Sequence, residues 1–380
     1  MNRGLGRVAS FVALVLLPAT LPAGPRARDL GVPFDGRPGP LNAITDVTGV
    51  EVGHTTLIRG EGALVVGQGP VRTGVTAILP RGRDDRAPVF AGWHALNGNG
   101  EMTGTAWIDE SGILDGPIML TNTHSVGIVR DAVIQWQVRH RRSPGEVWWS
   151  LPVVAETWDG WLNDLNGFHV RPEHAFAALD SARGGPVAEG SVGGGTGMIC
   201  HEFKGGIGTA SRLTPAGYVV GVLVQANYGL RGQLRIAGVP VGREIPEGRI
   251  RDEEAGSLLV IIATDAPLGP HQLRRLARRP TLALGRLGSI SGDGSGDLFL
   301  AFSTGNAVPT QAGQPGTVRM LPTGDLSPLF AAVVEATEEA IVNALVAAET
   351  MTGRDGHTAL ALPHDRLRAI LARHGRLEQR

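Results

Sequence analysis

The stretch Ser257-Leu258-Leu259-Val260-Ile261-Ile262-Ala263-Thr264 is apolar at almost every position and follows directly on Gly256. An uninterrupted apolar run of this length is typical of a strand that is buried on both faces. A second such run, from Tyr218 to Gln225, lies shortly before it. Strands that are apolar on both faces must be covered on both faces. The two runs therefore predict a sheet that is buried between other layers.

Weaker patterns elsewhere predict further strands, with helices between them. Strands are expected over 75–79, 89–94, 116–122, 151–155 and 298–303, and a hairpin over 42–58 that turns at Thr48-Gly49. Helices are expected over 125–139, 172–183, 270–278, 328–351 and 364–373. The polar segment 231–254 shows no clear period and predicts an exposed loop. Helices interleaved with buried strands predict an α/β fold in which sheets lie between helices, without a linker that divides the chain.

The composition excludes several classes of protein. The 380 residues carry 35 basic and 36 acidic side chains, and 42% are hydrophobic, which argues against disorder and against a dedicated nucleic-acid binder. One cysteine, Cys200, excludes an intrachain disulfide and a thiolate metal cluster. The one lysine, Lys204, precedes Gly205 instead of Ser or Thr, so there is no Walker-type phosphate loop. The histidines show no zinc-site spacing, and we expect neither a metal nor an organic cofactor.

The first 23 residues have the parts of a secretory signal peptide. Two arginines precede an apolar run from Val8 to Leu17, and small residues follow up to Ala23. The run is shorter than the roughly 20 residues that a membrane span needs. We therefore expect cleavage near Ala23, export to the periplasm or medium, and no membrane association afterwards. A buried N-terminal helix is the alternative interpretation.

A glycine run, Gly193-Gly194-Gly195-Thr196-Gly197, stands near the middle of the chain. A dinucleotide-binding loop would require a strand before it and a helix after it, and the flanking residues favour neither. The run is better interpreted as a tight backbone turn close to a site. The chain also lacks the Gly-x-Ser-x-Gly elbow of α/β-hydrolases.

The Gly256-Ser257 junction joins a polar segment to a buried strand. If this peptide bond were cut, Ser257 would carry both a hydroxyl group and a free α-amine. An α-amine has an unperturbed pKa of about 7.7–8.0. A neutral amine could accept the proton of its own hydroxyl and so activate it as a nucleophile. A Gly-Ser pair before a strand is also common in proteins without such chemistry, so the pair alone leaves both interpretations open.

Several separated segments, taken in order, add a resemblance. From about Arg26 to the C-terminal helix, the chain resembles the L-aminopeptidase/D-amidase/D-esterase and β-peptidyl aminopeptidase family of self-processing serine hydrolases with an N-terminal nucleophile. The segments that carry it are Arg28-Asp29-Leu30-Gly31-Val32, Asn42-Ala43-Ile44-Thr45-Asp46-Val47, Leu151-Pro152-Val153-Val154-Ala155-Glu156-Thr157, Gly193-Gly194-Gly195-Thr196-Gly197-Met198, Val224-Gln225-Ala226-Asn227, Gly256-Ser257-Leu258 and Gly292-Asp293-Gly294-Ser295-Gly296-Asp297.

The resemblance implies a role for each matching residue. Ser257 matches the nucleophile that autocleavage frees, and Ser295 matches a second serine that hydrogen-bonds near it. Asp297 matches an acidic partner of that cluster. Asn227 matches the asparagine whose side-chain amide faces the oxyanion, a donor worth roughly 3–4 kcal/mol in the transition state. Glu156 lies where family members keep an acid near the free amino end of the substrate.

The chain departs from the family pattern at Trp158. Some members have a tyrosine there, and its phenol is assigned to the oxyanion or the substrate. An indole N–H can donate a hydrogen bond but cannot act as an acid in that way. We therefore expect the oxyanion site to depend more on Asn227 and backbone N–H groups, and Trp158 to shape the substrate pocket together with Trp161.

The resemblance also implies a fold and an organisation. It implies a four-layer αββα sandwich of the N-terminal-nucleophile type, one domain split by cleavage at Gly256-Ser257 into a larger chain, 24–256, and a smaller chain, 257–380. The substrate would be a small peptide or amino-acid amide, and the cleaved heterodimers would assemble into a homo-oligomer. The rival interpretations are an acyltransferase of the ornithine acetyltransferase type, whose nucleophile is a threonine, and a non-catalytic periplasmic binding protein with the same fold.

Overall fold

A computed structural model describes residues 24–85, 87–140 and 147–378. The signal peptide predicted for residues 1–23 lies outside the described residues. Within those ranges most of the strands belong to two sheets, and none of the helices combines the length and apolarity that crossing a lipid bilayer requires.

One sheet has four strands and the other has six. In spatial order the four-stranded sheet contains β1 (Glu51–Arg59), β2 (Val71–Leu79), β5 (Ile118–Asn122) and β6 (Val153–Thr157). The six-stranded sheet contains β4 (Ile113–Leu114), β3 (Val89–Gly98), β12 (Gly294–Ser303), β11 (Ala255–Thr264), β10 (Val219–Asn227) and β9 (Gly206–Leu213). Two small hairpins are formed by β7 (Ile199–Cys200) with β8 (Phe203–Lys204) and by β13 (Met351–Thr352) with β14 (Thr358–Ala359).

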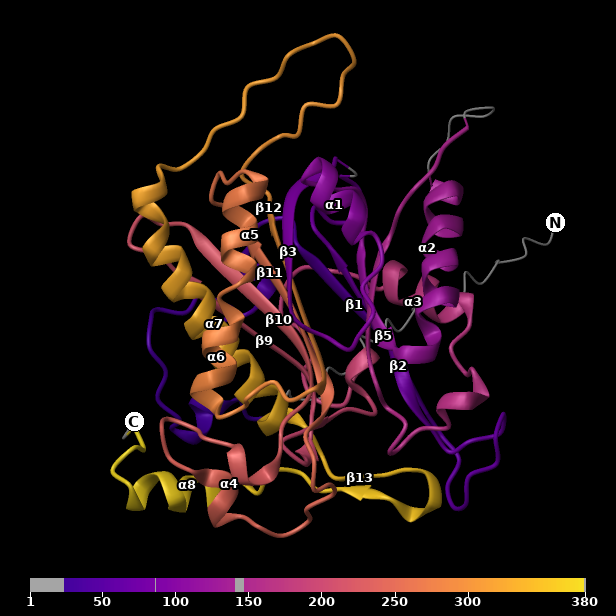
Figure 1. Cartoon of the computed structure of the whole chain (residues 1–380), viewed down its shortest axis with the longest axis vertical. Helices are drawn as coiled ribbons and strands as arrows, with labels where there is room; N and C mark the ends of the chain where they lie inside the picture. Colours follow the sequence, from indigo (N-terminus) through magenta and orange to yellow (C-terminus); the bar gives the residue numbers. More distant parts are fainter. Residues whose placement is uncertain (1–23, 86, 141–146, 379–380) are drawn as a thin grey trace, which may run out of the picture.

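Helices cover the outer face of each sheet (Figure 1). The four-stranded sheet carries α2 (Val126–His140) and α3 (Pro172–Asp180), and the six-stranded sheet carries α5 (Pro270–Ala277), α6 (Pro280–Leu287) and α7 (Ser327–Ala347). The remaining α-helices are α1 (Thr105–Ser111), α4 (Val241–Glu244) and α8 (His364–Arg373). Short 3₁₀ turns are η1 (Ala27–Leu30), η2 (Ile44–Asp46), η3 (Thr123–Ser125), η4 (Leu165–Gly167), η5 (Gly193–Gly195), η6 (Arg231–Gln233), η7 (Thr323–Leu326) and η8 (Arg354–Gly356).

Three separate hydrophobic cores lie at the three interfaces between these layers. One core joins α5, α6 and α7 to the six-stranded sheet, a second lies between the two sheets, and a third joins the four-stranded sheet to α2 and α3. An αββα sandwich has three such interfaces, so the three cores define four layers. The predicted four-layer fold is confirmed.

Strand β11 serves two of these cores, as its apolar sequence predicts. Leu258, Val260 and Ile262 belong to the core under the helices, whereas Leu259 and Ile261 belong to the core between the sheets. Strand β11 runs parallel to β12, and a parallel pair needs a crossover connection. Helices α5 and α6 supply that crossover.

Most predicted elements are confirmed, but two predictions are wrong. Residues 42–58 do not form a hairpin: Ile44–Asp46 is a 3₁₀ turn, and only β1 follows it. The backbone N–H of Ile44 donates to the hydroxyl of Thr209 in β9 instead of to a strand partner. Segment 231–254 is not an exposed loop throughout, because Arg231, Leu234 and several neighbours are fully buried.

Candidate active site

Three adjacent strands of the six-stranded sheet bring the predicted catalytic residues together. Asn227, the last residue of β10, lies opposite Ser257 in the antiparallel pair of β10 and β11. In the parallel pair of β11 and β12, Ser257 lies opposite Gly296, and Gly256 lies opposite Ser295. Ser257 is only 4% exposed. A serine near the start of a central strand thus has Asn227 opposite it on one side, and on the other side Gly296, which lies between Ser295 and Asp297.

Gly256, immediately before this serine, has a backbone conformation that side chains rarely adopt. Its φ is +131°, and a Cβ built at this position would lie 1.8 Å from the carbonyl oxygen of Asn227. Only glycine fits both the dihedral angle and the space. The peptide that joins Gly256 to Ser257 is therefore held in an unusual conformation against the end of β10.

The side-chain amide of Asn227 has a defined orientation. Its Oδ1 accepts a hydrogen bond from the backbone N–H of Ile199 (2.8 Å), and its Nδ2 donates to the carbonyl oxygen of Trp158 (2.9 Å). An amide nitrogen has two N–H donors. One is used by Trp158, so the second can serve a negatively charged oxygen that forms beside Ser257.

Ser295 and Asp297 form a buried pair at the start of β12. The hydroxyl of Ser295 donates to Oδ1 of Asp297 (2.9 Å), and the backbone N–H of Leu258 donates to the same oxygen (3.2 Å). Both side chains are fully buried. Burial raises the pKa of Asp297 above its usual range, although these hydrogen bonds oppose the shift. The pair therefore contacts the backbone of the residue next to Ser257.

Glu156 reaches the same place from the other sheet, at the end of β6. Its carboxylate accepts hydrogen bonds from the backbone N–H of Glu101 (3.0 Å) and from the hydroxyl of Thr123. A Cβ built on Gly100 would lie 3.4 Å from both Oε1 of Glu156 and Cα of Gly296, so only this glycine separates Glu156 from β12. Burial raises the pKa of Glu156.

Trp158 and Asp159, which follow shortly after Glu156, lie beside the site. The indole of Trp158 lies over Gly160 and is 41% exposed, so it borders solvent next to the site. Asp159 is buried, and its Oδ1 accepts a hydrogen bond from Nδ2 of Asn163 (3.0 Å). Burial raises the pKa of Asp159 to about 7. The residue that follows the carbonyl group bound by Asn227 thus carries a buried carboxyl group whose pKa lies near neutral pH.

The glycine run near the middle of the chain forms the tight turn η5. A Cβ on Gly194 would lie 2.2 Å from Oε1 of Gln225, and one on Gly195 would lie 2.5 Å from the backbone nitrogen of Ile207. The run therefore lets this turn approach β9 and β10 closely. It opens no helix of the kind that a dinucleotide-binding loop needs.

Sequence reasoning missed two residues of this site. Thr123 holds the carboxylate of Glu156, and Gly100 forms the contact between the sheets. Thr123 follows directly on a strand end, and Gly100 belongs to the glycine-rich stretch Asn97-Gly98-Asn99-Gly100. The glycine-rich stretch around Gly100 could have been recognised in the sequence. The contact of Thr123 with Glu156 could not, because it depends on how β5 and β6 pair.

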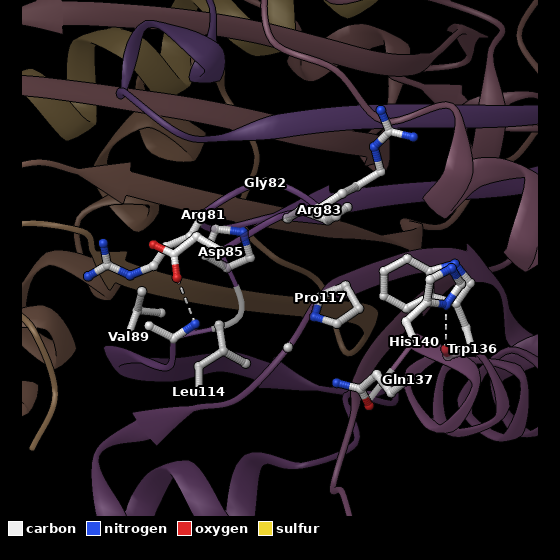
Figure 2. A pocket seen from close by; sticks show the side chains of 14 residues that line it. Arg81, Gly82, Arg83, Asp85, Val89, Leu114, Pro117, Trp136, Gln137 and His140 are labelled. Atoms are coloured by element: carbon white, nitrogen blue, oxygen red, sulfur yellow. Dashed lines mark hydrogen bonds between the residues drawn. The ribbon is translucent and has the colours of Figure 1, made fainter. Parts of the chain in front are cut away.

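A separate hollow lies at the other end of the four-stranded sheet (Figure 2). It has a volume of about 40 Å³ between the loop after β2 and α2, and its lining includes Arg81, Leu114 and Gln137. Nδ1 of His140 contacts the carbonyl oxygen of Trp136 at its edge (2.7 Å). The residues described above lie near the start of β2 instead, so this hollow is not part of the same site.

Known proteins resemble the chain over nearly its whole length. It is 55% identical to the beta-peptidyl aminopeptidase BapA of Sphingosinicella microcystinivorans, and the match covers 97% of each chain. Among solved structures, a Burkholderia sp. beta-aminopeptidase is 51% identical with a TM-score of 0.84, and covers 92% of this chain and 99% of its own. The L-aminopeptidase D-Ala-esterase/amidase of Ochrobactrum anthropi, described as a variant of the Ntn hydrolase fold, is 48% identical with a TM-score of 0.87, over 93% and 99%.

The four layers and the serine at the start of a central strand define a serine aminopeptidase with the fold of the N-terminal-nucleophile hydrolases. The family model for peptidase family S58 matches residues 42–359, and the chain belongs to that family. The resemblance inferred from the sequence segments is confirmed.

Proposed function

We propose that the chain cuts itself between Gly256 and Ser257 and then acts as an aminopeptidase through Ser257. The observation that carries this proposal is the register at the start of β11. There Asn227 lies opposite Ser257, and the preceding glycine is held at a φ of +131°. The reaction that follows needs a nucleophile, a base and an oxyanion donor, and each has a candidate within this cluster.

Self-cleavage would begin with attack by Oγ of Ser257 on the carbonyl carbon of Gly256. The new C–O bond replaces the C–N bond, and the hydroxyl proton passes to the released nitrogen. Water then hydrolyses the resulting ester, which leaves a carboxylate on Gly256 and both a hydroxyl and an amine on Ser257. Glycine adopts the φ of +131° without the steric cost that a side chain would bring, so the chain can present this carbonyl group to Oγ of Ser257.

Peptide hydrolysis would use the same atoms. The amine of Ser257, with an unperturbed pKa of about 7.7–8.0, accepts the proton as Oγ attacks the carbonyl of the first substrate residue. The free N–H of the Asn227 amide stabilises the oxyanion. The amine transfers its proton to the leaving group, and water releases the acyl residue from the enzyme. Ser295 and Asp297 hold the backbone beside the nucleophile in place.

Selection for a free amino end would come from Glu156. Its carboxylate is the acid that approaches β12 from the other sheet, and it is held by two hydrogen bonds. A protonated amine next to it would gain a charged hydrogen bond, worth about 1.5–3 kcal/mol. An acetylated peptide would lose that interaction. Trp158 would border the pocket for the substrate side chain.

The names of the relatives suggest the substrate classes. Two are described as acting on β-peptides or β-amino-acid substrates, and one as acting on L-amino-acid peptides and on D-Ala esters and amides. We infer that this chain takes small peptides, amides or esters with a free amino end, β-amino-acid residues included. Residues 1–23 would direct export of the chain and be removed in the process, and pairs of 24–256 and 257–380 would associate into oligomers.

A substrate panel tests this activity. Purified protein is incubated with β-, L- and D-amino-acid amides and with the acetylated form of each, and the released residue is measured. We expect release from free amines only, and none by the variant Ser257→Ala. Equal hydrolysis of acetylated and free substrates would contradict the role of Glu156, and activity of Ser257→Ala would contradict the nucleophile.

A further inference from the structure

Two fully buried charged residues, Glu202 and Arg231, take no part in the mechanism above. Glu202 and His201 form the tip of the hairpin between β7 and β8, and their φ angles are +60° and +47°. Such conformations cost non-glycine residues about 1–3 kcal/mol each and persist only where the surroundings enforce them. The contacts of Glu202 and Arg231 show what enforces them.

The guanidinium group of Arg231 binds backbone carbonyl groups from two directions. Its Nε and Nη2 donate to the carbonyl oxygens of His201 (3.0 Å) and Glu202 (2.6 Å) at the hairpin tip. Its Nη1 donates to the carbonyl oxygens of Ile245 (3.0 Å) and Glu247 (2.5 Å). The group also lies 3.3 Å from the ring centre of a phenylalanine in β8. Arg231 thus ties the hairpin to the segment that leads toward Ser257.

The carboxylate of Glu202 binds N–H groups of the same segment. It accepts hydrogen bonds from the backbone N–H groups of Ile250 and Arg251 and from that of Arg231 (2.6 Å). Burial alone would raise the pKa of Glu202, but these N–H groups and the charge of Arg231 hold it below its usual range. Burial lowers the pKa of Arg231 to about 10, which still leaves it protonated at neutral pH.

A second attachment lies closer to Ser257. Oε2 of Glu254 accepts a hydrogen bond from Nε2 of Gln233 (3.0 Å), and its Oε1 accepts one from the hydroxyl of Ser289 (2.8 Å). Gln233 belongs to the same 3₁₀ turn as Arg231. This turn begins four residues after Asn227. The oxyanion donor and the residues that hold the segment leading to Ser257 are therefore close together in the sequence.

We propose that Glu202 and Arg231 are positioning residues for self-cleavage, because they fix residues 245–251 and so hold the Gly256–Ser257 peptide in its observed conformation beside Asn227. The inference rests on the proposed function and adds the part of the chain that presents the scissile bond. Residues 252–256 span at most about 20 Å between the last held N–H and Ser257. With residues 245–251 held at one end and β11 at the other, the carbonyl group of Gly256 has little freedom to turn away from Asn227.

The same arrangement has a consequence after cleavage. The new carboxyl end at Gly256 must leave the site before a substrate can enter. The contacts of Glu202 end at Arg251, and the exposed Asp252 and Glu253 follow it. The new end at Gly256 can therefore leave the site once the two hydrogen bonds of Glu254 break, while residues 245–251 stay attached. Once the chain is cut, the positioning residues should matter little for turnover.

The test compares cleavage with turnover in the full chain. Wild type, Glu202→Gln and the matched control Glu253→Gln are made by pulse-labelled cell-free translation, and the half-time of cleavage is measured on denaturing gels. Gln at position 202 keeps the size of the side chain but places an N–H₂ group against an N–H donor. We expect a cleavage half-time at least tenfold longer for Glu202→Gln, and unchanged for Glu253→Gln. Fully cut Glu202→Gln should keep kcat within twofold of wild type.

A second variant covers the case in which Glu202→Gln does not fold. Glu202→Asp keeps the charge beside Arg231 but is too short to reach both N–H groups of 250–251, so it should also cut slowly. Cleavage of a folded variant at the wild-type rate, or an equal loss of kcat, would overturn the proposal. So would the absence of a cooperative thermal transition in both variants. An uncut wild-type chain would instead reject self-cleavage itself.

Discussion

Asn227 shows how one side chain can combine a structural and a chemical role. Its Oδ1 is occupied by the N–H of Ile199 and one of its N–H groups by the carbonyl of Trp158. These two contacts fix the amide so that the remaining N–H points away from both. A donor that is fixed before the reaction stabilises developing charge without reorganisation, which is why such donors contribute strongly.

Replacement of this amide should reduce turnover far more than it reduces stability. For Asn227→Ala we expect kcat to fall about 10²–10³-fold. The unpaired Ile199 N–H and Trp158 carbonyl should also lower the free energy of unfolding by about 1–3 kcal/mol. Steady-state kinetics well below the melting temperature separate the two effects, with the exposed Gln311→Ala as control. A fall in kcat of less than threefold would contradict the oxyanion role.

Asp159 predicts a pH dependence of stability. Its pKa in the folded protein is raised to about 7, against about 3.9 in an unfolded chain. The folded state therefore binds the proton more tightly, so this contribution to stability is complete below pH 4 and is lost as pH rises through about 7. Urea unfolding should show that, between pH 5 and 8, the free energy of unfolding falls less with rising pH for Asp159→Asn than for wild type. Parallel losses in the two proteins would contradict the raised pKa.

Glu156 should control affinity for the free amino end. For Glu156→Gln we expect kcat/KM to fall at least tenfold toward free-amine substrates, because a charged hydrogen bond is worth about 1.5–3 kcal/mol. Self-cleavage involves no free amino end and should continue at the wild-type rate. Kinetics and denaturing gels of one preparation provide both measurements. Unchanged kcat/KM would place amine recognition elsewhere.

At the scale of elements, apolar runs predicted the central strands, but a strand whose buried residues are partly polar was not predicted. Strands β10 and β11 are apolar enough to be recognised alone. Strand β9 was missed because its buried residues include Thr209, Ser211 and Arg212, which are satisfied by partners far away in the sequence. The error over 231–254 has the same cause, since the burial of Arg231 depends on carbonyl groups that only the folded chain brings together.

Close packing of α7 on β9 gives a prediction at this scale. A Cβ on Gly208 of β9 would lie 1.9 Å from the carbonyl oxygen of Ala340 in α7, so Gly208→Ala must push the helix away from the sheet. We expect a loss of about 1–3 kcal/mol. The matched change Gly285→Ala, in open space on α6, should instead stabilise by up to about 1 kcal/mol. Thermal unfolding of both variants tests the pair, and equal shifts would contradict the packing.

At the scale of the whole molecule, the proposed cut would fall inside one folded unit. Strand β11 from Ser257 onward would begin the smaller chain, yet these residues pair with β10 of the larger chain. The cores on both faces of this sheet contain residues from before and after the junction. The four layers could be predicted from the sequence with the family resemblance, as could the residues at the junction. The contacts that hold the approaching segment could not, because they join residues separated by up to 49 positions.

The identity of the chain termini in purified protein tests the central claim most directly. The measurement is intact mass and N-terminal sequencing of denatured wild type and Ser257→Ala after export. We predict two wild-type chains, one of which begins Ser257-Leu258-Leu259, and a single uncut chain for Ser257→Ala. A fully active wild-type enzyme that remains one chain, or a cut at another bond, would contradict the account.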